Sequence, residues 1–206
     1  DWITALLVGD LSPQNIKRSV CAAGHKAMFN NQWNGLPDKE FLETLSPGLG
    51  DFRDRLYSEA FSSENLAGYL SESWAKKLGL SINVAVAVGA FDAHMGAVGA
   101  GITTGALVKI VGTSTCDIMI HPQTEKLSDV PGVCGIVNGS VRDGVFGIEA
   151  GQSGVGDIFL WFVNNLVPEK YGKSSEEKFK NLEKAASKLK AGESGLLALD
   201  WNNGNR

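Results

Sequence analysis

The sequence has no excess of basic residues and few cysteines. Of its 206 residues, 19 are Lys or Arg and 23 are Asp or Glu, which gives a formal net charge of -4. Binding to nucleic acid needs basic side chains that replace the counterions of phosphates, so this composition argues against a nucleic-acid partner. Cys21, Cys116 and Cys134 are odd in number and have no CxxC spacing. They indicate reduced thiols in a cytoplasmic protein rather than a disulfide framework, and we expect all three to pack as small hydrophobic residues.

Several well-known sequence signatures are also missing. There is no GxxxxGK[ST] phosphate loop, no GxSxG nucleophile turn and no GxGxxG after a predicted strand. The apolar run at residues 2–8 is too short to span a bilayer and lacks a basic flank. His25, His94 and His121 do not have metal-ligand spacing. We therefore expect polar surface or hydrogen-bonding histidines, no metal site and no membrane span.

What the chain does contain is an alternation of helical and extended patterns. Hydrophobic residues make up 43% of it, enough for a sizeable core. Apolar spacing, capping residues and glycine stops predict the helices, and valine-rich runs bounded by glycine predict the strands. The Gly24-His25-Lys26 cluster is predicted to lie in a loop. Expected helices cover residues 2–8, 13–21, 38–45, 71–78, 94–100, 157–165 and 174–191, and expected strands cover 84–88, two segments within 107–120 and a hairpin within 135–146.

The composition changes near Asn83, from a charged, irregular region to one rich in valine, alanine and glycine. We place a domain boundary there. The predicted domains are residues 1–82 and residues 83–206.

Asp92 is the first candidate for chemistry. It follows the predicted strand at residues 84–88, which should be buried on both faces, and it precedes a stretch of glycine and alanine. Small neighbours let a substrate approach a carboxylate closely, as a general base requires. The alternative is that Asp92 only caps the following helix. The residues by themselves leave both roles open.

Two further segments carry polar groups in glycine-rich turns. The turn Gly112-Thr113-Ser114-Thr115 could hold a phosphate with its amides and hydroxyls, or it could simply join two strands. Glu149 lies between apolar residues, and a carboxylate in such a position usually binds a hydroxyl or a backbone donor.

Taken in order, these segments resemble a known family. The sequence GAFDAH at residues 89–94 is followed by GAVGAG, by VGTSTCD and by the Glu149 turn that leads to Trp161-Phe162. AGHKAM at residues 23–28 and LDWNNGNR at the end of the chain add to the pattern. Together they are similar to the FGGY family of carbohydrate kinases, most of all to its L-ribulokinases.

The resemblance implies an α/β fold of the actin-like (ribonuclease H-like) ATPase type, with this chain holding parts of two domains. It implies ATP-dependent phosphorylation of a ketopentose, L-ribulose to L-ribulose 5-phosphate, with ATP and Mg²⁺ as cofactors and a possible homodimer. His94 stands near a position where the family often has glutamine or asparagine, so it receives no role. The implied residues are Asp92 as catalytic base, Lys26, Asp92 and Glu149 for the sugar, and Gly112, Thr113 and Gly156 for the nucleotide.

Two family segments have no counterpart in the 206 residues: the Asp-x-Gly-Thr phosphate loop and the glycine-rich adenosine loop. We therefore expect this stretch to be an internal portion of a longer kinase, inactive by itself. A kinase for xylulose or another sugar, and a non-catalytic actin-like binding module, are the alternatives.

Overall fold

The computed structural model describes residues 1–198, which form two compact units. One unit comprises residues 1–110 and 117–150, and the other comprises residues 111–116 with the chain from residue 151 onward. The predicted similarity of LDWNNGNR falls on residues 199–206, outside the described part. The two units divide the chain by compactness, and the domain boundary between residues 82 and 83 stays a prediction.

Three short helices of the first unit, α1, α3 and α5, begin and end within one residue of the predicted bounds. Asp38 caps α3, where its carboxylate accepts a hydrogen bond from the amide of Phe41 at 2.8 Å. Gly9 ends α1 and Gly79 ends α5, both in the left-handed conformation that glycine adopts without strain. The bounds are α1 Trp2–Val8, α2 Val20–Lys26, a 3₁₀ turn Asn31–Trp33, α3 Lys39–Leu45, α4 Leu49–Arg53 and α5 Glu72–Leu78.

The prediction for residues 13–26 is wrong. The expected helix starting at Pro13 is only a turn, and the expected loop at residues 24–26 lies inside α2. The reason is a cap that the sequence reading missed. The Ser19 hydroxyl accepts a hydrogen bond from the amide of Ala22 and so starts the helix at Val20, seven positions after Pro13. His25 and Lys26 consequently project from the last turn of a helix.

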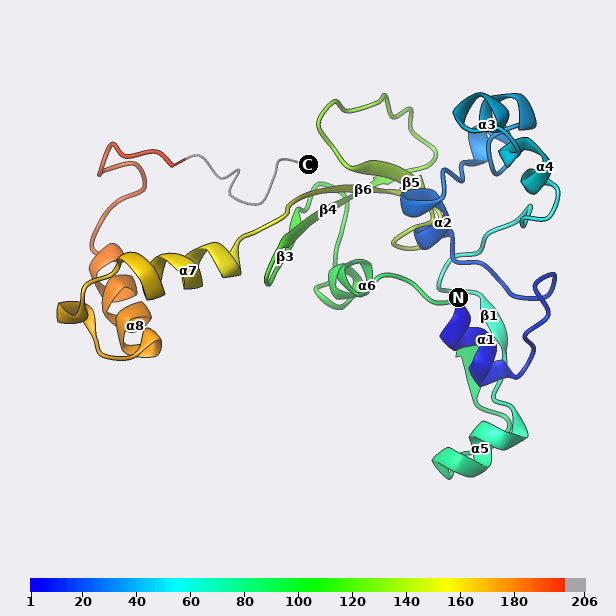
Figure 1. Ribbon diagram of the computed structural model, residues 1–206, viewed down its shortest axis with the longest axis horizontal. Helices are drawn as coiled ribbons and strands as arrows, with labels where there is room; N and C mark the ends of the chain where they lie inside the picture. Colours follow the sequence, from blue (N-terminus) through cyan, green and yellow to red (C-terminus); the bar gives the residue numbers. More distant parts are fainter. Residues whose placement is uncertain (199–206) are drawn as a thin grey trace. The chain divides into compact units, whose positions relative to one another are not determined.

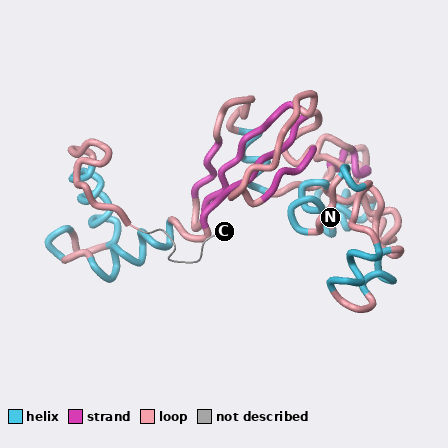
Figure 2. The backbone as a smooth tube through the Cα atoms, turned by 90° about the horizontal axis from the view of Figure 1, so that it is seen from above, coloured by secondary structure: helices cyan, strands magenta, loops and turns pink. Residues whose placement is uncertain are grey.

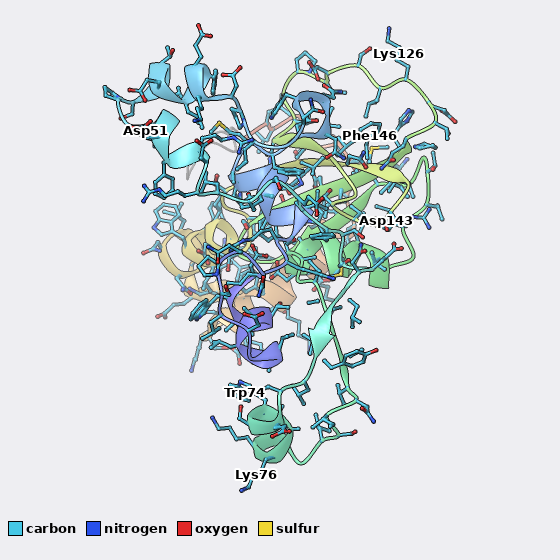
Figure 3. All side chains as sticks on the ribbon, turned by 90° about the vertical axis from the view of Figure 1, so that its right-hand side faces the viewer. Asp51, Trp74, Lys76, Lys126, Asp143 and Phe146 are labelled. Carbon is cyan, nitrogen blue, oxygen red and sulfur yellow. The ribbon has the colours of Figure 1, made fainter. Side chains whose placement is uncertain are left out.

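A two-stranded antiparallel ribbon pairs β1 (Leu66–Tyr69) with β2 (Ala85–Ala87), and α5 lies in the connection between the two strands. Trp74 and Lys76 project from α5 in Figure 3. Strand β2 was expected to be buried on both faces, and this is wrong because Ala85 and Ala87 are exposed. In the described residues β2 pairs only with β1, so no second neighbour covers it.

The larger sheet has four strands in the order β3-β4-β6-β5, seen side by side in Figure 2. β5 and β6 form the predicted antiparallel hairpin, although the connection spans residues 139–144 instead of a two-residue turn. Gly139 enters that connection with a positive φ of 77°. The bounds are β3 Val108–Val111, β4 Thr115–Pro122, β5 Gly135–Asn138 and β6 Val145–Gln152.

Helix α2 packs against β5 (Figure 1) and builds a small core with it. A Cβ added at Gly24 would lie 2.3 Å from a methyl carbon of Val137, so only glycine allows the helix this close to the strand. The close approach places His25 beside the β5–β6 pair. The cluster consists of Val20, Ala23, Phe29, Leu36 and Val137, with Tyr57 and Ala60 packed at its edge.

Helix α6 (Asp92–Gly99) follows the β1–β2 ribbon and presents a face of small residues to the core. Ala93, His94 and Ala97 are its buried residues. Gly96 faces Ile110, with a distance of 3.1 Å from the position a Cβ would take to the Ile110 side chain. Small side chains therefore bring α6, and His94 with it, close to the strands.

The second unit contains the predicted helices α7 and α8. The Ser174 hydroxyl caps α8 by accepting from the amide of Glu177, and α7 exposes the large apolar residues Phe159, Leu160 and Trp161. Among residues 1–198 no helix combines the length and apolarity needed to cross a membrane. The bounds are α7 Gly156–Leu166, a 3₁₀ turn Glu169–Tyr171 and α8 Ser175–Ala186.

Candidate functional site

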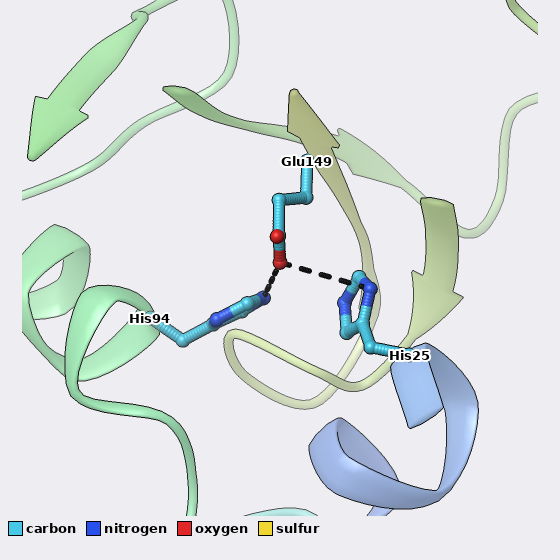
Figure 4. Close-up of side chains that lie close together, drawn as sticks. All are labelled: His25, His94 and Glu149. Atoms are coloured by element: carbon cyan, nitrogen blue, oxygen red, sulfur yellow. Dashed lines mark ion pairs between the residues drawn. The ribbon is translucent and has the colours of Figure 1, made fainter. Parts of the chain in front are cut away.

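Three polar side chains from three separate elements meet in the interior of the first unit (Figure 4). His25 comes from α2, His94 from α6 and Glu149 from β6. Oε2 of Glu149 lies 3.7 Å from Nδ1 of His25 and 3.6 Å from Nε2 of His94. The side chains of His25, His94 and Glu149 are 3%, 1% and 9% exposed. The cluster is therefore a buried group of two imidazoles and one carboxylate.

The two distances are longer than hydrogen bonds. Nε2 of His25 and both ring nitrogens of His94 are buried and have no hydrogen-bond partner among the described residues. A buried polar atom left without a partner costs roughly 1–3 kcal/mol, and a water molecule or an ion at the site can recover that cost. The prediction that His25 and His94 are surface or hydrogen-bonded residues is wrong, because the fold encloses both rings.

Burial sets the protonation state of the two histidines. It lowers the pKa of His25 to about 4, and the positive charge of Lys26 contributes to the lowering. Burial also lowers the pKa of His94 to about 4, assisted by His25 and opposed by the carboxylates of Glu149 and Asp92. Both imidazoles are therefore neutral at pH 7. Although they lie within ion-pair distance of Glu149, they do not form ion pairs with it.

Phe91 links this cluster to the residues predicted for the sugar. Its ring centroid is 5.9 Å from that of His94 and 6.3 Å from that of His25. Nζ of Lys26 lies 5.7 Å from the same centroid, within the range of a cation–π contact. The next residue in the chain is Asp92. Lys26, Phe91 and Asp92 therefore surround the edge of the buried cluster.

Asp92 is exposed and is the first residue of α6. Its Oδ1 accepts a hydrogen bond from the amide of Ala93 at 2.8 Å, and no residue in 1–198 donates to Oδ2. Phe91, whose side chain makes no capping bond, occupies the cap position. The Asp92 carboxylate therefore bonds a first-turn amide, as the capping alternative expects, although Phe91 holds the cap position. Its Oδ2 is left without a hydrogen bond from the described residues.

Cys21 lies close to the same group. Burial raises the pKa of its thiol to about 11, so it is a neutral packing residue, as the sequence predicts for it. Cys134, in contrast, is exposed, which contradicts the expectation that it packs. Its amide donates to the carbonyl of Glu149 at 2.6 Å.

The predicted nucleotide residues lie together in the second unit. The amide of Gly156 donates to the carbonyl of Gly112 at 3.1 Å, and the amide of Val155 donates to that of Thr113 at 2.8 Å. A Cβ on Gly156 would stand 2.7 Å from the Gly112 oxygen. Since the Gly112 amide is bonded to the Ser114 carbonyl, it is not available to a phosphate. Backbone hydrogen bonds therefore hold the turn at residues 112–115 against the start of α7.

The sequence predicts roles for Lys26, Asp92 and Glu149 but gives none to the two histidines, which the fold places beside them. A signal was present, because His25 directly precedes Lys26 and His94 follows Asp92 by two positions. It could not be read from spacing, since the three members of the cluster are far apart in the chain and the folding of α2, α6 and β6 brings them together.

The fold has close counterparts among solved structures. The xylulose kinase of Rhodospirillum rubrum aligns with the whole of this chain, which covers 38% of the kinase, with a TM-score of 0.74 and 20% identity. The ligand-bound xylulose kinase of Lactobacillus acidophilus gives 0.70 at 18% identity with the same coverage. These similarities show the fold alone: the chain has the α/β, actin-like architecture of sugar kinases, as predicted.

Sequence comparison finds similarity to one family of kinases. Residues 107–206 match the model for the FGGY family of carbohydrate kinases, C-terminal domain. The whole chain is 44% identical to a ribulokinase of Vibrio parahaemolyticus and 42% identical to one of Bacillus licheniformis, of which it covers 39% and 37%. The chain is therefore similar over its whole length to members of the FGGY family of carbohydrate kinases, and it spans less than two fifths of the length of these relatives.

Proposed function

We propose that the full-length protein transfers the terminal phosphoryl group of ATP to L-ribulose and releases L-ribulose 5-phosphate and ADP. The arrangement of Lys26, Asp92 and Glu149 around one buried cluster is the observation that carries the proposal. Similarity to ribulokinases over the whole chain supports the choice of sugar.

In this mechanism the open carboxylate oxygen of Asp92 accepts the proton of the attacking sugar hydroxyl. The hydroxyl oxygen forms a bond to the terminal phosphorus as the bond to the leaving ADP oxygen breaks. An exposed carboxylate at the start of a helix suits this role because it can reach the substrate, while its hydrogen bond to Ala93 fixes its position.

Lys26 and Glu149 bind the sugar. The Lys26 ammonium donates up to three hydrogen bonds and the Glu149 carboxylate only accepts, so together they match hydroxyls that both accept and donate. Glu149 is mostly enclosed, and a buried carboxylate gains more from a hydroxyl donor than an exposed one does.

Gly112, Thr113 and Gly156 line the nucleotide position, and the Thr113 hydroxyl donates to a phosphate, because the amides of Gly112 and Gly156 are already bonded to carbonyls. The glycines allow the backbone to approach the phosphates closely, and Gly156 opens a helix of eleven residues whose amino end favours anions. Mg²⁺ enters as the ATP complex and neutralises phosphate charge. The His25, His94 and Glu149 set does not fit Mg²⁺, which prefers an all-oxygen shell. We place the protein in the cytoplasm, where ATP and the sugar are available, and propose a homodimer for the full-length enzyme.

A substrate panel tests the proposal. Full-length protein with ATP and Mg²⁺ is assayed for ADP release with L-ribulose, D-ribulose, D-xylulose and no sugar. We expect kcat/KM for L-ribulose to be at least about tenfold above that for D-xylulose, a difference of about 1.4 kcal/mol in transition-state binding. Equal or higher efficiency with D-xylulose would overturn the choice of sugar. ADP release that no sugar stimulates would overturn the kinase activity and favour a non-catalytic module.

A further inference from the structure

We propose that Nδ1 of His25, Nε2 of His94 and the Glu149 carboxylate form a binding site for one transition-metal ion of the Zn²⁺ class. This site shares Glu149 with the proposed sugar contacts and is separate from the Mg²⁺ of the ATP complex. The test below uses neither sugar nor nucleotide, so it does not depend on the proposed kinase activity.

The three donor atoms have the spacing that a metal ion requires. All lie within 4.8 Å of one another, with 3.6 and 3.7 Å between the carboxylate oxygen and the two nitrogens. A point equidistant from three atoms at such separations lies roughly 2.0–2.4 Å from each, close to the Zn–N and Zn–O bond lengths of about 2.0–2.2 Å. A metal ion therefore fits with only small shifts of the side chains.

The histidine nitrogens are also left unsatisfied in a way that a ligand would correct. His94 is 1% exposed, its Nε2 points toward Glu149 in Figure 4, and it has no hydrogen-bond partner among residues 1–198. Neutral imidazole nitrogens of this kind have a lone pair to offer to a metal.

The donor set selects the class of metal. Two imidazoles and one carboxylate suit Zn²⁺, Co²⁺ and related ions rather than Mg²⁺ or Ca²⁺, which prefer oxygen ligands. Three protein ligands leave a fourth position for water or a substrate atom, the arrangement of open zinc sites.

Some charges around the cluster favour a bound cation and one opposes it. The ammonium of Lys26, which lies near Phe91, opposes a bound cation, because it already disfavours a positive charge on His25. The carboxylates of Glu149 and Asp92 stabilise positive charge at His94, so they favour a bound cation. The two carboxylates outnumber the single ammonium, so the local charge favours a divalent cation.

Metal titration of the full-length protein tests the site. The protein is stripped with a chelator, titrated with ZnCl₂ by calorimetry and with CoCl₂ by visible absorption, without sugar or nucleotide. We expect one equivalent to bind and Co²⁺ to give visible bands without a near-ultraviolet thiolate band. His94→Gln and Glu149→Gln should each weaken Zn²⁺ binding at least tenfold.

His121→Gln is the matched control, because His121 forms a second histidine–glutamate pair outside the cluster, with Glu125 at 3.9 Å and with side chains 25% and 66% exposed. It should bind Zn²⁺ like the unaltered protein. If circular dichroism shows that His94→Gln does not fold, His25→Gln takes its place. Absence of stoichiometric binding, unchanged affinity in the cluster variants, or a thiolate band that assigns the metal to cysteine would each overturn the proposal.

Discussion

Gly135 lies directly opposite Glu149 in the antiparallel β5–β6 pair, and this pairing fixes the position of the carboxylate next to His25. A Cβ added at Gly135 would stand 2.9 Å from Nδ1 of His25. The strand therefore needs a residue without a side chain at this point, because the space above it belongs to the imidazole.

Gly135→Ala should displace His25 and disturb the contact between α2 and the sheet. We expect the free energy of unfolding to fall by about 1–3 kcal/mol, as for other overpacked sites, and the KM for L-ribulose to rise several-fold. Urea unfolding and steady-state kinetics of the full-length protein measure the two effects. Gly99→Ala is the control, since a Cβ there meets no atom within 4 Å. A Gly135→Ala protein that matches this control would contradict the packing argument.

The sequence predicted those parts of the fold that depend on local signals. Asp38 caps α3, Gly79 ends α5 and Asn138-Gly139 leads into a hairpin, because each acts on residues next to it. The failures have non-local causes. Ala85 and Ala87 look like a central strand, but exposure is decided by which strands pair with β2.

The candidate site divides in the same way. Asp92 and Glu149 could be found from their unusual small or apolar neighbours. The role of His25 could not, since it depends on Gly24 allowing α2 close to Val137 and on Gly135 leaving room for the ring. Both close approaches depend on the folded arrangement of the chain and cannot be predicted from the order of residues.

Gly156→Ala should separate the start of α7 from the turn at Gly112. Its Cβ would meet the Gly112 carbonyl oxygen at 2.7 Å and weaken the hydrogen bond between the two backbones. We expect the KM for ATP to rise several-fold with little change in the KM for the sugar. Kinetics at saturating L-ribulose and varied ATP measure this. A selective rise in the sugar KM would remove Gly156 from the nucleotide role.

The two buried histidines predict a pH dependence of stability. Their pKa values are about 4 in the folded protein and about 6.5 in an unfolded chain. Between these values the unfolded state binds more protons, so the free energy of unfolding falls as the pH is lowered from 6.5 toward 4. Each histidine contributes at most about 1.4 kcal/mol per pH unit.

Urea unfolding at several pH values measures that slope, with tryptophan fluorescence as the signal. His94→Gln should make it shallower, because one of the two groups is gone. His121→Gln, outside the cluster, should leave the slope unchanged. If His94→Gln does not change the slope, the pKa of His94 is not lowered in the folded protein.

Helix α3 offers a matched test of capping. The Asp38 side chain accepts a hydrogen bond from the helix, whereas Ser71, at the same position of α5, accepts none. Asp38→Ala should lower the local stability of α3 by about 1 kcal/mol, and Ser71→Ala should affect α5 less. Hydrogen exchange of the two helices measures both. Equal acceleration of exchange would contradict the difference in capping.

The most direct test of the kinase mechanism is Asp92→Asn in the full-length protein, measured by turnover and by sugar binding together. Loss of the proton acceptor should lower kcat by about 10²–10⁴-fold, while L-ribulose still binds, because the amide keeps the shape and the contact to Ala93. Asp51→Asn, an exposed first-turn acid of α4, should leave both unchanged. Turnover by Asp92→Asn equal to that of the Asp51→Asn control would contradict the role of Asp92 as the base.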